Sequence, residues 1–148
     1  MNNNPDSWMR LKQIAEQKRD VTARRYANLA TQRKDAQQKL QLLLDYRLDY
    51  QARLESASRM GIRGEGLRNY QGFLANLERA IEQQTDLMTT LQTEVSAAQK
   101  KVSLEHRRIE SFQVLDDRRT DLADTKDRRR QQALQDEMAN RSHLKVVR

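Results

Sequence analysis

The sequence predicts an all-α protein, a long two-helix antiparallel coiled-coil hairpin with a C-terminal overhang. Only 36% of the 148 residues are hydrophobic and 33% are charged, which is lean for the core of a compact globule. All four glycines fall within residues 61–72, and Pro5 is the only proline. The sequence therefore has one internal site at which a helix is expected to end. Apolar residues also recur with the seven-residue period of a coiled coil.

We expect the first helix over residues 7–59. The side-chain oxygen of Asp6 or Ser7 can cap it by accepting a hydrogen bond from a free backbone N–H of the first turn. The heptad match of this helix is partial, because Arg33 and Arg47 interrupt it. Its two heptad sets are Tyr26, Leu40 and Leu54, and Leu29, Ala36, Leu43, Tyr50 and Ala57.

The start of the first helix shows a different apolar stripe, made of Leu11, Ile14 and Val21. This stripe is out of phase with the heptad sets that begin at Tyr26. A change of phase predicts a shift of register and a local unwinding of the supercoil. We expect that unwinding between Val21 and Tyr26.

The second helix is expected over residues 67–140, after a turn over residues 60–66. Its heptad pattern is cleaner than that of the first helix, and this spacing predicts a left-handed supercoil. One set consists of Leu67, Leu74, Ile81, Met88, Val95, Val102 and Ile109. The complementary set consists of Tyr70, Leu77, Gln84, Leu91, Ala98, Glu105 and Phe112.

The turn predicts which residues of the two helices lie opposite each other. A turn centred near Arg63 pairs residues whose numbers add up to about 127 in an antiparallel hairpin. Phe73 and Leu77 then lie opposite residues 50–54, and residues 80–84 lie opposite residues 43–46. Ser7 faces Thr120, so residues from about 120 to 148 form an overhang without a partner helix. Residues 1–148 are accordingly interpreted as one coiled-coil rod with a basic tail that ends at residue 148.

Composition and motifs argue against catalysis. The chain has no cysteine, which excludes a disulfide framework, a thiolate metal site and a cysteine nucleophile. His106 and His143 do not form an H-x-x-x-H pair, and the glycines do not form a phosphate-binding loop. A thin coiled coil offers no enclosed cavity for catalytic groups. We therefore expect no catalytic residues, no metal and no cofactor, and a cytosolic protein without a signal peptide or membrane span.

The net charge of +7 favours acidic partners. Basic residues concentrate near the C-terminus, at Lys126, Arg128, Arg129, Arg130, Arg141, Lys145 and Arg148. This segment is either a contact with an acidic cavity of a partner or a solvated helix end that suits the helix dipole. Binding of nucleic acid is less favoured, because acidic residues alternate with the basic ones and no aromatic residues stand among them.

Apolar residues outside the seam form the most informative feature. In the first helix Leu42, Leu44, Tyr46 and Leu48 widen the apolar arc beyond what a two-stranded coil buries. In the second helix Phe73 lies beside the seam position of Leu74. The two groups are expected to form one exposed patch, which is more often an interaction site than a widened seam.

The same region resembles the flagellar export protein FliJ family. The resemblance covers residues 40–84 most closely and rests on short motifs. These are Asp45-Tyr46, Tyr50, Gly61-Ile62, Asn69-Tyr70-Gln71, Phe73-Leu74 and the LERAIEQQ run of residues 77–84. It implies a non-catalytic stalk of the flagellar type III export apparatus, cytoplasmic and peripherally associated with the inner membrane.

The resemblance also implies partners and sites. The implied partners are the hexameric export ATPase FliI, the export gate protein FlhA and the export chaperones FlgN and FliT. The implied gate-binding patch comprises Leu43, Tyr46, Tyr50, Phe73, Leu77, Ala80 and Gln84. The implied ATPase contacts are Lys126, Arg128, Arg129 and Arg130. The corresponding stalk of a virulence injectisome is the nearest alternative, and a basic coiled coil that binds nucleic acid is the alternative from a different class.

Overall fold

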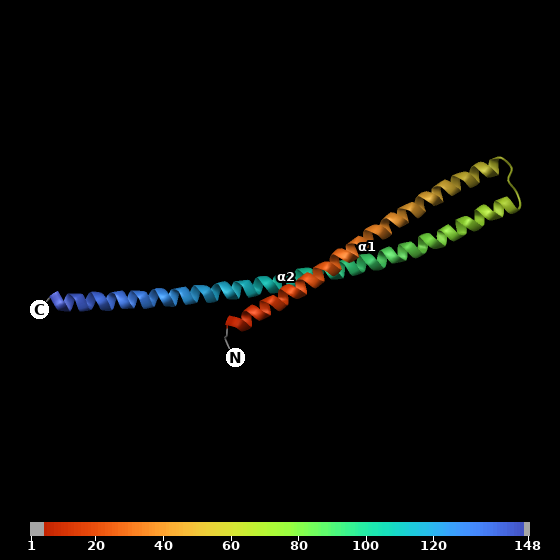
Figure 1. Cartoon of the computed structure of the whole chain (residues 1–148). Coiled ribbons are helices and arrows are strands. Elements are labelled where there is room, and N and C mark those ends of the chain that lie inside the picture. Colours follow the sequence, from red (N-terminus) through yellow and green to blue (C-terminus); the bar gives the residue numbers. More distant parts are fainter. Residues whose placement is uncertain (1–4, 147–148) are drawn as a thin grey trace. The chain divides into compact units, whose positions relative to one another are not determined.

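The computed structural model describes residues 5–146 and confirms the predicted all-α helical hairpin. Helix α1 spans Pro5–Arg59 and helix α2 spans Glu65–Val146 (Figure 1). The turn between them is limited to residues 60–64. Helix α2 begins earlier than the expected residue 67 and continues past the expected end at residue 140.

The end of α1 is stabilised by a glycine cap. Gly61 has φ of +91°, a left-handed conformation that costs glycine little. Its N–H donates to the Ser58 carbonyl at 3.2 Å, and the Ile62 N–H donates to the Ala57 carbonyl at 3.0 Å. This pair of bonds is the Schellman motif, which satisfies carbonyls that a helix end otherwise leaves without partners. Helix α1 therefore ends just before Gly61, where the chain reverses its direction.

The heptad positions of α2 form the seam that the sequence predicts. Members of both predicted sets from Leu67 to Phe112 are buried or half-buried. The buried residues of α2 are Leu77, Ile81, Gln84, Leu91, Val95 and Ala98. The main cluster joins Leu91, Val95 and Ala98 to Leu29 and Ala36 of α1, with Tyr26 and Met88 packed against it.

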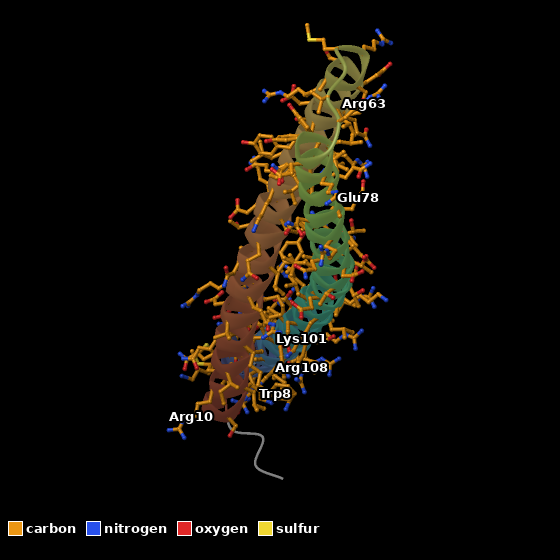
Figure 2. All side chains as sticks on the ribbon, turned by 90° about the vertical axis from the view of Figure 1, so that its right-hand side faces the viewer. Trp8, Arg10, Arg63, Glu78, Lys101 and Arg108 are labelled. Carbon is orange, nitrogen blue, oxygen red and sulfur yellow. The ribbon has the colours of Figure 1, made fainter. Side chains whose placement is uncertain are left out.

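The two arginines that interrupt the heptads of α1 bind across the seam. Arg33 donates to the Gln92 side chain at 3.1 Å, and Arg47 forms an ion pair with Glu78, labelled in Figure 2, at 3.2 Å. Both arginines are half-buried. A long aliphatic stem can cover apolar surface while its charged end reaches a polar partner. These interruptions are therefore compatible with helix pairing.

Contacts divide the chain into two units, residues 19–103 and residues 5–18 with 104–146. In the first unit α1 and α2 pair around the cluster described above. In the second unit the Trp8 and Phe112 rings meet edge to face with centroids 6.0 Å apart. Lys12 donates to the Gln113 side chain at 2.7 Å in the same unit. Each unit thus contains its own contacts between the two helices.

The predicted shift of register before Tyr26 is wrong. Thr22 and Ala15 are buried, and they continue the seven-residue spacing of Leu29 and Ala36. Leu11, Ile14 and Val21, which the sequence suggested as the stripe, are 47%, 50% and 64% exposed. Small side chains occupy the seam here, and their weak hydrophobic signal hides the continuous heptad.

The predicted pairing of residues whose numbers add up to about 127 is also wrong. The contacting pairs add up to 120–125, as in Ala36 with Gln84 and Arg47 with Glu78. Gln84 consequently lies against Ala36 rather than against residues 43–46. The actual turn is shorter than predicted, and the knobs of one seam must enter the holes of the other. A midpoint at residue 62 gives a sum of 124, so the shorter turn and the packing of the seam agree on the register.

The C-terminal part of α2 has no buried residue. Every residue from Thr120 to Val146 is exposed. The segment begins where the expected overhang begins. It is helical as far as Val146, beyond the expected end of the helix at residue 140. We call residues 120–146 the overhang.

Candidate interaction surface

Three aromatic side chains meet near the turn. The rings of Tyr50 and Phe73 stack with centroids 4.0 Å apart and an interplanar angle of 24°. The Tyr70 ring is tilted by 59° relative to the Tyr50 ring, and their centroids are 6.2 Å apart. The Arg53 guanidinium carbon lies 5.6 Å from the Tyr50 ring centroid, within the range of a cation–π contact. We call these four residues the aromatic cluster.

The heptad pattern explains the geometry of this cluster. Tyr50 and Tyr70 occupy seam positions and are half-buried, whereas Phe73 lies beside the seam and is 42% exposed. Phe73 reaches its stacking partner on α1 across the edge of the seam. The predicted placement of Phe73 opposite residues 50–54 is therefore confirmed, although the general pairing rule is not.

The aromatic cluster borders a small open pocket of about 280 Å³. Asn69 completes its lining beside Tyr50, Arg53, Tyr70 and Phe73. An apolar wall with a few polar groups at the rim is typical of a recognition site. Sequence reasoning did not assign Arg53 to this site, because only the fold shows that it lies over the Tyr50 ring.

Exposed apolar side chains continue this surface along α1. Leu42 and Tyr46, one turn apart on the same face of α1, are 53% and 49% exposed. Leu48 is 65% exposed, but a residue two positions from Tyr46 faces the other side of the helix. Apolar side chains of this size left in solvent at neighbouring positions mark an interaction surface more often than scattered ones do. The expectation that apolar residues remain exposed outside the seam is met at these positions.

The seven residues assigned to gate binding occupy different environments. Tyr46 and Phe73 are exposed, and Leu43, Tyr50 and Ala80 are half-buried. Leu77 and Gln84 are buried, 6% and 7% exposed, because both stand in the seam. The Gln84 side-chain amide donates to the Ala36 carbonyl at 2.9 Å. These two residues support the helix pairing and offer little surface to a partner.

The residues assigned to ATPase contact lie on the overhang. Lys126, Arg128, Arg129 and Arg130 are all exposed. Within residues 5–146 none of the four forms a hydrogen bond or ion pair. Their charges are thus available to an acidic surface, while Asp127 among them lowers the local excess of positive charge.

Comparisons with known proteins agree with this architecture. The family model described as "Flagellar FliJ protein" matches residues 9–148. A protein named "Flagellar FliJ protein" from Salmonella typhi is 32% identical over 135 residues, which cover 91% of this chain and 92% of that protein. A protein of the same name from Escherichia coli K12 is 28% identical over the same shares of both chains.

This chain belongs to the flagellar FliJ protein family. The match covers the aromatic cluster and the overhang of this FliJ-family chain, so both features lie inside the matched region. Among residues 5–146, neither helix has an apolar stretch long enough to cross a membrane. In the same part of the chain, no group of three or more histidine or acidic side chains is placed to hold a metal ion.

Proposed function

We propose that this FliJ-family protein is a non-catalytic coiled-coil component of the flagellar type III protein export apparatus. It links the hexameric export ATPase FliI to the export gate protein FlhA and handles the export chaperones FlgN and FliT. It works at the cytoplasmic side of the inner membrane, held there by the apparatus. Membership of the flagellar FliJ family supports this proposal.

The assignment of the gate contact rests on the aromatic surface that Tyr46 and the aromatic cluster form. Tyr46 and Phe73 combine large apolar rings with few rotatable bonds, and Tyr50 fixes Phe73 by stacking. Rigid aromatic anchors lose little conformational entropy on binding and often carry much of an interface's affinity. We therefore assign the gate contact to Tyr46, Tyr50 and Phe73, with Leu43 and Ala80 at its edge. Leu77 and Gln84 hold the helices together beneath it.

The ATPase contact is assigned to the overhang. Lys126, Arg128, Arg129 and Arg130 present cations on the overhang, in which every residue from 120 to 146 is exposed. A ring that encloses the overhang with acidic side chains would gain charge-assisted hydrogen bonds, above all from the planar arginine groups. The two contacts lie on different parts of the sequence, as a linking role requires.

The decisive experiment compares Phe73→Ala with Leu74→Ala. Loss of an aromatic anchor commonly costs ~2 kcal/mol or more of binding energy, so Phe73→Ala should weaken binding to the cytoplasmic domain of FlhA by at least roughly 30-fold. Loss of the Tyr50 stack should lower the stability of the hairpin by about 0.5–1.5 kcal/mol beyond the effect of the apolar area that Phe73 buries, which is limited because Phe73 is 42% exposed. Leu74→Ala, at a half-buried seam position, should cost ~2 kcal/mol or more of stability. Binding titrations and circular dichroism melts measure both effects.

Leu104→Ala is the matched control, because Leu104 is an apolar side chain that is 61% exposed and lies outside the aromatic surface. It should change neither binding nor melting. If Phe73→Ala destabilises the hairpin as strongly as Leu74→Ala while the folded fraction still binds FlhA normally, the aromatic cluster belongs to the core and the gate assignment fails.

A further inference from the structure

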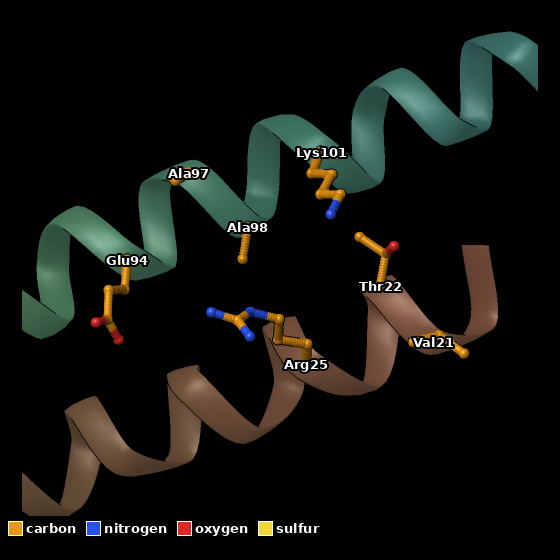
Figure 3. Close-up of a pocket in the computed structure, with 7 residues that line it drawn as sticks. All are labelled: Val21, Thr22, Arg25, Glu94, Ala97, Ala98 and Lys101. Carbon is orange, nitrogen blue, oxygen red and sulfur yellow. The ribbon is translucent and has the colours of Figure 1, made fainter. Parts of the chain in front are cut away.

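A second groove lies within residues 19–103, away from the aromatic cluster in sequence. It has a volume of about 440 Å³ and opens to solvent between α1 and α2. Its lining consists of Val21, Thr22, Arg25, Glu94, Ala97, Ala98 and Lys101. Figure 3 shows the Arg25 side chain reaching from α1 toward α2 and the Lys101 side chain reaching from α2 toward α1. We call it the basic groove.

The basic groove exists because small residues meet at the seam. Thr22 and Ala98 are both buried, and Ala97 beside them contributes only a methyl group. Space that Tyr50, Tyr70 and Phe73 fill at the aromatic cluster stays open here. Val21 adds an apolar wall that is 64% exposed. The floor and one wall of the groove are thus mainly apolar.

Two cations without partners stand at this groove. Among residues 5–146, neither Arg25 nor Lys101 forms a hydrogen bond or an ion pair. Arg47, by contrast, is paired with Glu78 across the seam. Residues 8–39 hold nine Lys and Arg against three Asp and Glu, so the basic groove lies against the most basic stretch of α1. Glu94 is the single acidic group in the lining.

We propose that the basic groove binds an acidic amphipathic helix of a partner protein. The shape favours a helix, because side chains of a third helix can enter the gap between two paired ones. Its apolar side chains would cover Val21 and Ala97, and its carboxylates would pair with Arg25 and Lys101. Complementary charge gives such docking its orientation and specificity, and Glu94 repels a carboxylate at its own end. This surface is separate from the proposed gate and ATPase contacts.

A smaller groove in the other unit also combines apolar side chains with two basic ones. It measures about 140 Å³ and lies within the unit of residues 5–18 and 104–146. Leu11, Ile14, Ala15 and Phe112 supply its apolar lining, and Lys18 and Arg108 supply one cation from each helix. Considered by itself, this groove also combines apolar surface with two basic side chains. Its chemistry independently supports an acidic, partly apolar ligand.

A peptide titration with the full chain tests the proposal. The probe is a fluorescein-labelled helical peptide of about 21 residues, or three heptads, with Leu at a and d and Glu at e and g, so that repulsion limits its self-association. The double variant Arg25→Glu with Lys101→Glu should weaken binding by about tenfold or more, because two attractive pairs become repulsive. The matched control is Arg24→Glu with Lys100→Glu, which makes the same charge change one residue earlier in each helix, outside the groove lining. It should weaken binding by less than about threefold, through the long-range field alone.

A steric pair of variants provides an independent measurement. Ala97→Phe should fill the groove and abolish peptide binding with little change in melting, because Ala97 is exposed. Ala27→Phe, at an exposed position outside the groove lining, should bind normally. A probe with Gln in place of every Leu should lose its affinity as well. Equal weakening by both charge-reversed double variants, or no binding by the unmodified chain, would overturn the proposal.

Discussion

Two segments of the same helix show what a partner contributes. In α2, residues 65–103 include six buried side chains, among them Leu91 and Val95, whereas residues 120–146 include none. The first segment gains stability from apolar area removed from water. The second depends on helix propensity and local pairs, such as Arg141 with Glu137 at 3.0 Å. Each pair of this kind contributes only about 0.2–0.5 kcal/mol.

This comparison explains a difference in composition. The paired segment needs an apolar residue at most seam positions, because each one meets the other helix. The overhang needs no seam, so its exposed apolar residues Leu122, Leu134 and Met138 do not stabilise a contact within the chain. Regular helix therefore does not by itself indicate where the stability of this protein resides.

The largest expected effect comes from removing a buried seam residue. Leu91 is 5% exposed and belongs to the main apolar cluster. Leu91→Ala should lower the free energy of unfolding by about 2–5 kcal/mol, because it leaves a cavity between the helices. Leu134→Ala on the overhang, at a position 58% exposed, should change it by less than about 0.5 kcal/mol. Urea unfolding followed by circular dichroism measures both. Similar losses in the two variants would mean that the overhang is packed in solution.

An intermediate effect is expected at the turn, where the two helices join. A Cβ at Gly61 would meet nothing within 4 Å, so Gly61→Ala tests only the left-handed backbone. It should cost ~1–2 kcal/mol, the cost of a left-handed conformation for a residue with a side chain. Gly72, inside α2, also has nothing within 4 Å of its Cβ position and has no positive φ. Gly72→Ala should therefore stabilise the protein by about 0.5–1 kcal/mol. Thermal melts measure both effects. If the melting temperature rises in both variants or falls in both, this account of the turn is wrong.

The smallest effect on stability should come from removing the overhang. A chain that ends at Thr120 should melt within a few degrees of the full chain, because no buried residue is lost. Its total helical signal should fall, since the overhang is helical. The same truncation should weaken any effect of the protein on FliI ATPase activity, because the basic side chains of the proposed ATPase contact are then missing. If the truncated chain affects FliI ATPase activity as strongly as the full chain does, the assignment of the ATPase contact to Lys126, Arg128, Arg129 and Arg130 is wrong. A large drop in melting temperature would contradict the conclusion that the overhang contributes little stability.

The sequence by itself determined the fold class, the site of the turn and the seam of α2. These features depend on signals that the chain carries locally. Glycines confined to residues 61–72 end one helix, and a strict heptad from Leu67 to Phe112 fixes which face of the next helix is apolar. Phe73, outside that heptad, was recognised for the same reason as a side chain left beside the seam.

Only the tertiary structure decided how the two seams interlock. Ala15 and Thr22 continue the seam of α1 because small side chains suffice where α2 covers them, and the larger Leu11, Ile14 and Val21 gave a misleading periodic signal. The contact of Gln84 with Ala36 and the open basic groove beside Ala98 depend on register. Heptads repeat every seven residues, so the pattern alone permits several registers, and the fit of knobs into holes selects one of them.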